Sequence, residues 1–139
     1  MMRILGLDLG SKTLGVSISD ALRIIARPLT TIRFNEDCYE EALASLLAII
    51  YEEKTNEVVL GLPRHMNGDI GIRGELSISF KEMLERATDV KVILWDERLT
   101  TKVANQVLIS ANVSRKKRKK VVDQVAAVVI LQSYLDSLN

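Results

Sequence analysis

The sequence predicts a single α/β domain over residues 1–139, with its elements in the order βββαβαβαα. Short apolar runs of strand length fill the first third of the chain. Patterns with helical spacing then alternate with two further short runs, and two helical patterns follow. Such alternation is typical of a mixed sheet whose later strands are joined by right-handed crossovers, with helices against its faces. With 47% apolar residues, the chain can also bury one core.

The first three elements are predicted strands. Residues 3–9 form a mostly apolar run, residues 13–19 alternate apolar with small or polar side chains, and residues 24–32 make a third candidate. The connection at residues 10–12 is short and begins with glycine, which favours an antiparallel hairpin between the first two strands.

Helical and strand patterns alternate in the middle of the chain. Residues 39–53 carry apolar side chains at i, i+3, i+4 and i+7, which predicts an amphipathic helix. Residues 58–62 predict a strand that stops at Pro63. Residues 76–87 then repeat the helical spacing, and residues 90–95 predict another buried strand.

Two helices and a basic run complete the prediction. Thr100 or Thr101 can cap a helix that carries apolar residues over 103–111, and residues 121–138 give the longest helical pattern. Six consecutive basic residues, 115–120, lie between the two helices. Without them the net charge of +1 becomes −5, because 13 basic residues remain against 18 acidic ones. Such a localised run is either a contact for a polyanion or a solvated loop.

The composition excludes several classes of protein. One cysteine, Cys38, permits no intramolecular disulfide, and together with one histidine, His65, it cannot supply the ligands of a structural zinc site. The same scarcity argues against Ser-His-Asp and Cys-His mechanisms. No apolar run approaches the roughly 18 residues of a membrane helix, so we expect a cytoplasmic protein without a membrane partner. Aromatic residues make up 4%, so a nucleic acid would be bound mainly through its phosphates.

Acidic residues occupy three places where the pattern predicts an apolar or constrained environment. Asp8 lies near the end of the first strand, Asp96 and Glu97 follow the strand at 90–95, and Asp123 lies in the first turn of the last helix, on its apolar stripe. Each has a structural explanation: an Asx-turn for Asp8, an ion pair for Glu97 and the helix dipole for Asp123.

A second explanation for these acidic residues is that they share a metal site. Strand ends at one edge of a sheet can converge with the first turn of a helix, and three carboxylates that meet there need cations. Oxygen ligands suit Mg²⁺ or Mn²⁺, and two such ions are a recurring device for hydrolysing phosphodiesters. Glycines flank this edge at residues 6–15 and 61–74 if the first and fourth strands are parallel neighbours, and they serve either turn geometry or the close approach of a ligand.

Four stretches carry a resemblance to a known family. They are residues 6–12 (GLDLGSK), 59–68 (VLGLPRHMNG), 96–101 (DERLTT) and 120–132 (KVVDQVAAVVILQ). In this order, over nearly the whole chain, they closely resemble the YqgF family, also called RuvX-like proteins. That family is classed with the Holliday-junction resolvase-like, ribonuclease H-like nucleases, and its members are named as nucleases of pre-16S rRNA.

The resemblance implies a ribonuclease H-like fold with sheet order 3-2-1-4-5 and the second strand antiparallel to the rest. It also implies a catalytic triad at Asp8, Glu97 and Asp123 that binds Mg²⁺ or Mn²⁺, and a role in maturing the 5′ end of 16S rRNA. Lys12 and Arg98 match family positions beside two of these acids, and each either contacts a substrate phosphate or forms a structural ion pair. The basic run would hold the nucleic-acid backbone; it consists of Arg115, Lys116, Lys117, Arg118, Lys119 and Lys120.

The leading hypothesis is therefore a hydrolase that cuts precursor rRNA during ribosome biogenesis, as a monomer or weak dimer, with ribosomal particles as further partners. One alternative is a Holliday-junction resolvase, which cuts branched DNA symmetrically and needs a dimer. Another is a non-catalytic module that binds RNA or the ribosome. A third is an actin-like phosphotransferase, because residues 8–15 also look like its phosphate loop, although those enzymes clasp nucleotide between two such lobes.

Overall fold

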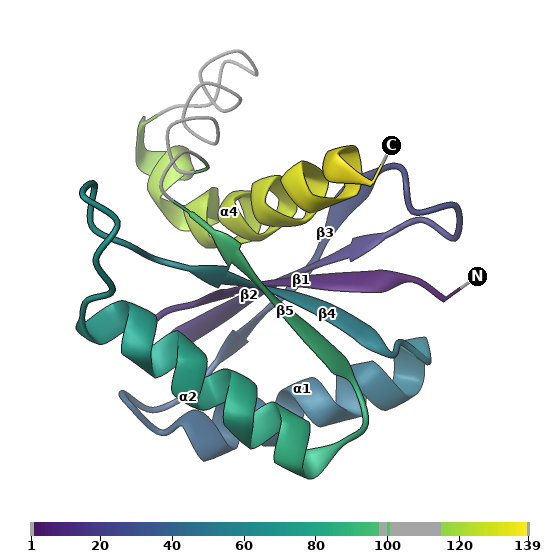
Figure 1. The fold of residues 1–139 in the computed structure, drawn as a ribbon, viewed down its shortest axis with the longest axis horizontal. Coiled ribbons are helices and arrows are strands. Elements are labelled where there is room, and N and C mark those ends of the chain that lie inside the picture. Colours follow the sequence, from purple (N-terminus) through teal and green to yellow (C-terminus); the bar gives the residue numbers. More distant parts are fainter. Residues whose placement is uncertain (1, 98–99, 101–114, 139) are drawn as a thin grey trace.

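The computed structural model describes residues 2–97, 100 and 115–138, and Figure 1 shows their arrangement. The strands are β1 (Ile4–Leu9), β2 (Thr13–Ser19), β3 (Ala26–Arg33), β4 (Glu57–Leu62) and β5 (Lys91–Asp96). The helices are α1 (Tyr39–Glu53), α2 (Ile72–Ala87) and α4 (Arg115–Ser137). The helix predicted over residues 103–111 lies outside the described residues.

The strands form one mixed sheet in the order β3-β2-β1-β4-β5, which confirms the expected topology. β2 runs antiparallel to both β1 and β3, whereas β1, β4 and β5 are parallel neighbours. α1 connects β1–β3 to β4, and α2 connects β4 to β5. Right-handed crossovers place both helices on the same face of the sheet, and Figure 1 shows α4 on the opposite face.

Each face of the sheet has its own hydrophobic cluster. On the face covered by α1 and α2, alternate residues of β1 and β2, among them Leu7 and Val16, pack in one cluster with helix residues such as Leu46 of α1. On the other face, Ile4 and Val59 pack against α4. The two clusters follow from the period-2 alternation of side chains along each strand.

β3 begins later than predicted because a polar turn binds the backbone of its first apolar residues. The Oδ1 atom of Asp20 accepts hydrogen bonds from the N–H groups of Ile24 (2.7 Å) and Ile25 (3.1 Å). Because these two N–H groups bond to the turn, they do not bond to a neighbouring strand, and β3 begins only at Ala26. Its start is also bonded to α4: Gln132 accepts from the Ala26 N–H and donates to the Ile24 carbonyl, both at 2.9 Å.

Two helices begin earlier than their apolar patterns indicate. α2 starts at Ile72, whose side chain is 79% exposed and so lies off the buried stripe that marks the predicted start at Leu76. α4 starts at Arg115, so the prediction that the last helix begins after the basic run is wrong. Residues 115–120 form the first turns of α4 and are not a loop. No helix within the described ranges is both long and apolar enough to span a membrane.

Candidate active site at the carboxyl edge of the sheet

The parallel strands end together at one edge of the sheet. Leu7 of β1 pairs with Leu60 of β4, and Leu62 of β4 pairs with Asp96 of β5. Asp8 lies one residue before the end of β1, and Glu97 directly follows β5. The carboxyl ends of parallel strands are where α/β proteins place their ligands, and the structure brings these two predicted acids to that edge.

Glu97 is held in place by its own backbone and by a glycine. Its N–H donates to the carbonyl of Leu62 (3.1 Å), while its carbonyl accepts from the N–H and the hydroxyl of Thr100, both at 3.0 Å. A Cβ added to Gly61 would lie 2.7 Å from Cδ of Glu97. The glycine in β4 therefore provides the space that the Glu97 carboxyl group occupies.

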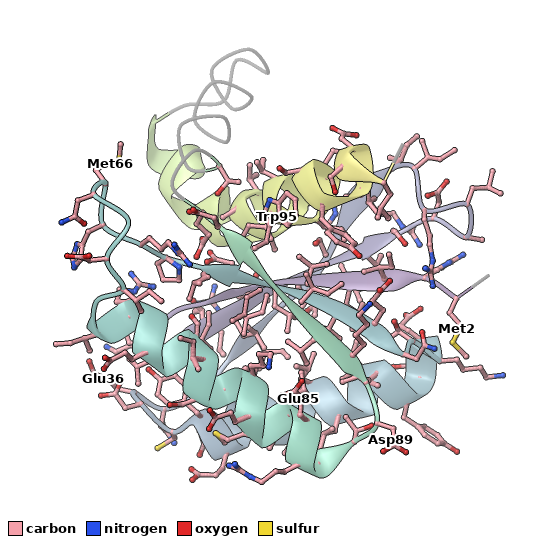
Figure 2. The ribbon with its side chains drawn as sticks, viewed as in Figure 1. Met2, Glu36, Met66, Glu85, Asp89 and Trp95 are labelled. Atoms are coloured by element: carbon pink, nitrogen blue, oxygen red, sulfur yellow. The ribbon has the colours of Figure 1, made fainter. Side chains whose placement is uncertain are left out.

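The side chain of Trp95, the next-to-last residue of β5, attaches the end of this strand to α4. The indole N–H of Trp95 donates to the hydroxyl of Ser133 at 3.0 Å, and its ring packs edge-on against Tyr134 at 5.5 Å between ring centroids. Figure 2 shows Trp95 between the sheet and α4. These contacts fix the end of β5, and with it the position of the residues that follow.

The carboxyl groups of Asp8 and Glu97 lie against each other. Burial, the negative charge of Asp8 and a hydrogen bond to Asp8 together raise the pKa of Glu97 to about 8, and burial is the largest of these causes. Arg73 opposes the rise, and Asp96 adds to it. A proton shared by two adjacent carboxyl groups is the usual response to like charges that cannot both ionise. A divalent cation between them would relieve the same repulsion.

The third predicted acid, Asp123, lies in α4 but not in its first turn as predicted. It follows the start of the helix at Arg115 by eight residues, which is more than two turns. Its side chain lies outside the described residues, so the predicted convergence of three acids stays a prediction. The side chains that the structure does describe contain no group of three Asp, Glu, His or Cys residues placed to hold a metal ion. The carboxylate oxygens of Asp8 and Glu97 are of the kind that bind Mg²⁺, and the pair could contribute to such a site.

One cation at this edge was not predicted from the sequence. Arg73, in the first turn of α2, donates from Nη2 to the carbonyl of Leu9 at 3.1 Å, and its charge acts on Glu97. Nothing in the local pattern separates Arg73 from the other arginines, because its role depends on how α2 docks against the end of β1. Lys12, the predicted cation of this region, is exposed in the turn after β1.

The predicted cation Arg98 and the side chains of residues 115–120 lie outside the described part of the chain, so their contacts with phosphate stay predictions.

His65 lies in the loop between β4 and α2, where its ring packs on Gly71. Its backbone N–H donates to the carbonyl of Asp69 at 2.9 Å. The turn residues around His65 in the sequence favour a surface loop, and the structure places this residue in one. Figure 2 shows Met66 at the tip of the same loop.

Comparison with known proteins places this arrangement in a family. A family model described as "RuvX: Holliday junction resolvase" matches residues 2–137. A Bacillus pumilus protein named "Putative pre-16S rRNA nuclease" is 55% identical over 138 residues, which cover 99% of this chain and 100% of that protein. A Staphylococcus haemolyticus protein of the same name is 52% identical, over 99% of this chain and 97% of its own length.

Solved structures share the fold at low sequence identity. The Fowlpox virus resolvase, in a complex with Holliday junction DNA, has a TM-score of 0.62 and 17% identity over 99% of both chains. RuvC of T. thermophilus, also with a Holliday junction substrate, has a TM-score of 0.62 and 14% identity over 99% of this chain and 96% of its own. The match over residues 2–137 and the identities above 50% show that the chain belongs to the RuvX family.

Proposed function

We propose that this protein is a nuclease that hydrolyses phosphodiester bonds of precursor 16S rRNA with the help of divalent metal ions. The observation that carries the proposal is the contact between the carboxyl groups of Asp8 and Glu97 at the carboxyl edge of the sheet. Buried like charges are costly unless a cation or a proton compensates them. The choice of substrate is supported by the names of the full-length relatives, which refer to pre-16S rRNA.

The donor chemistry of this edge fits Mg²⁺ or Mn²⁺. Both ions prefer oxygen ligands, and carboxylates are their usual protein donors. Asp8 and Glu97 would hold the metal, with Asp123 of α4 as the third carboxylate. When bound, the ions supply an activated water and stabilise the charge on the departing oxygen.

The residues of the chain itself prepare the site in three ways. Gly61 leaves space for the carboxyl group of Glu97, and the backbone bonds to Leu62 and Thr100 fix its position. The proton held between Asp8 and Glu97 must leave before both can act as ligands, so metal binding releases a proton. Arg73 lowers the pKa of Glu97 and so favours that release.

Substrate binding would come mainly from phosphate contacts. The basic run at the start of α4 precedes Asp123 on the same helix, which would bring the RNA backbone towards the acids. Lys12 and Arg98 would contact phosphates nearer the cut. We place this activity in the cytoplasm, with the precursor rRNA free or within ribosomal particles.

A cleavage assay tests the proposal directly. A labelled precursor 16S rRNA fragment is incubated with the wild-type protein in Mg²⁺, in Mn²⁺ and in EDTA. We expect cleavage in one or both metals, none in EDTA, and none with Asp8→Asn. Cleavage by Asp8→Asn at the wild-type rate would remove the carboxyl pair from the mechanism.

A second candidate function is resolution of Holliday junctions, which the description of the matching family favours. A resolvase must make two symmetric cuts, so it needs two sites at a fixed spacing in a dimer. A labelled four-way DNA junction in the same assay, with the oligomeric state measured by light scattering, separates the two functions. Paired symmetric cuts by a dimer would replace the RNA assignment.

A further inference from the structure

A cavity of about 160 Å³ opens beside the end of β1, close to the carboxyl pair but facing α1 and α2. Three segments line it: the turn after β1, the loop before α1 and the first turns of α2. The lining residues that matter here are Leu9, Gly10, Ser11, Asp37, Tyr39 and Arg73.

Hydrogen bonds hold the walls of this cavity together. The N–H of Asp37 donates to the carbonyl of Ser11, and the N–H of Phe34 donates to that of Lys12, both at 2.9 Å. The hydroxyl of Tyr39 donates to Oδ1 of Asp37 at 3.2 Å. Asp37 has a φ of 59°, a conformation that acidic and amide side chains tolerate better than most. The bond from Tyr39 to Oδ1 thus holds the exposed Asp37 carboxylate at the cavity, where a carboxylate oxygen can accept a hydrogen bond from a ligand.

Arg73 links the cavity to the carboxyl pair. Its guanidinium group lines the cavity and is anchored by the bond to the carbonyl of Leu9. Its charge acts on groups in both directions: it opposes the rise in the pKa of Glu97, which burial causes, and it opposes the smaller rise for Tyr39, which burial also causes. Arg73 is therefore placed to contact a ligand in the cavity, and its anchor, Leu9, directly follows Asp8 in β1.

We propose that this cavity binds the nucleotide that flanks the cleaved bond, with Arg73 contacting its phosphate and the carboxylate of Asp37 accepting a hydrogen bond from its ribose 2′-hydroxyl. The inference rests on the proposed nuclease function and deepens it, since it makes this edge selective for RNA. A guanidinium group suits phosphate. A fixed carboxylate beside it repels phosphate but suits a hydroxyl donor, and only RNA carries that donor.

A substitution scan along the RNA tests the role of Asp37. Single 2′-deoxy and single 2′-fluoro residues are introduced on each side of the cut. Binding is measured by fluorescence anisotropy with the Asp8→Asn variant, which we expect not to cleave the RNA. The 2′-fluoro group is the matched control, because it keeps the RNA-like sugar conformation but cannot donate a hydrogen bond. We expect both substitutions to weaken binding about tenfold at one flanking position and little elsewhere.

Two variants of Asp37 connect that position to the cavity. In Asp8→Asn/Asp37→Gly the acceptor is lost, while glycine still permits the positive φ, so the difference between ribose and 2′-fluoro should vanish at that position alone. In Asp8→Asn/Asp37→Asn the amide oxygen can still accept, and part of the difference should return. A scan with equal effects at every position, or a difference that survives in Asp37→Gly, would overturn the assignment.

A neutral phosphate tests the role of Arg73. A methylphosphonate at the flanking position should weaken binding to the Asp8→Asn protein about tenfold, but should have little further effect when Arg73→Gln is also present. A merely structural role for Arg73 predicts independent effects that multiply, because its bond to Leu9 does not involve the RNA. Multiplying effects would therefore contradict the phosphate contact.

The outcomes separate this inference from the proposed function. Cleavage of RNA with a flat 2′ scan would leave the nuclease standing and remove the nucleotide subsite. Position-specific binding without any cleavage by the wild-type protein would keep the subsite and remove the nuclease. Equal binding of RNA and of the matched DNA would remove the selectivity for ribose.

Discussion

The two faces of the sheet are built from residues of different size, and the difference shows which face carries the candidate site. Towards α1 and α2, β1 and β2 present large apolar side chains. Towards α4, the central strands present Gly6, Ser17 and Gly61, and the backbone of α4 comes close enough for the Ser17 hydroxyl to donate to the carbonyl of Ala127 at 2.8 Å. Both faces carry a hydrophobic cluster. We call the face towards α1 and α2 the filled face, and the face towards α4, where small residues leave room for the helix and for the carboxyl group of Glu97, the hollowed face.

The largest expected effect is on catalysis at the hollowed face. Asp8→Asn and Glu97→Gln should each lower the rate of metal-dependent RNA cleavage by about 100-fold or more, because each removes a charged oxygen donor from the metal site. Asp89→Asn is the matched control, since it removes the same charge at the opposite edge of the sheet, as Figure 2 shows. Rates are compared in single-turnover cleavage. An equal loss in the control would point to net charge and not to the site.

The second prediction concerns stability, and the two faces should respond to opposite changes in size. Leu46→Ala on the filled face should lower the free energy of unfolding by about 2–5 kcal/mol, because it leaves a cavity. Gly6→Ala on the hollowed face should lower it by about 1–3 kcal/mol through overpacking, because its Cβ would lie 2.6 Å from Cβ of Leu131 and 2.9 Å from the carbonyl of Ala127. Urea denaturation measures both.

Gly61→Ala sharpens this contrast. Its Cβ would meet the ends of two side chains, Glu97 and Ile130, and no backbone atom is among its nearest contacts. Side-chain ends can move, so the loss of stability should be smaller than for Gly6→Ala. Cleavage, however, should fall, because the carboxyl group of Glu97 is displaced. Normal activity in Gly61→Ala would show that the space beside Glu97 is not needed.

The third prediction tests whether the α4 side is also the side that binds nucleic acid. Replacing Arg115, Lys117 and Lys119 by glutamine should weaken RNA binding about tenfold near physiological salt and reduce the slope of log K against log salt concentration. The control replaces three exposed cations far from this helix. They are Lys54, Arg86 and Lys91. Equal effects in the two triple variants would indicate nonspecific attraction.

The last prediction concerns the dependence of stability on pH without metal. The folded pKa of Glu97 is about 8, above its ordinary value of 4.5, so the folded state binds more protons than the unfolded state between these values. The Tm in EDTA should therefore fall as the pH rises from 4.5 to 8, and Glu97→Gln should flatten this decline. A decline of the same size in Glu97→Gln would assign the effect to other groups.

The sequence predicted the elements whose stability comes from local periodicity. β2 and α1 have the predicted bounds, 13–19 and 39–53, because alternation and helical spacing are local properties. The start of α4 was missed because lysine and arginine favour helices without leaving an apolar pattern. At the site, the meeting of Asp8 and Glu97 followed from the ends of parallel strands.

The parts of the site that were missed depend on tertiary contacts. The space that Gly61 leaves for Glu97 depends on the register between β4 and β5, and the position of Arg73 depends on the docking of α2. Neither contact leaves a signal in the residues around it. The cavity at Asp37 likewise requires the loop before α1 to bond to the turn after β1.

The order of the elements has a consequence for how the chain folds during translation. α4 follows every strand in the chain, yet it packs against β1, β2, β3 and β4 and bonds to the start of β3 through Gln132. While the ribosome is still making α4, one side of the completed sheet exposes Ile4 and Val59 to water. Such uncovered apolar surface makes nascent chains prone to aggregate. The apolar residues on this side of the sheet are therefore buried only after α4 has left the exit tunnel.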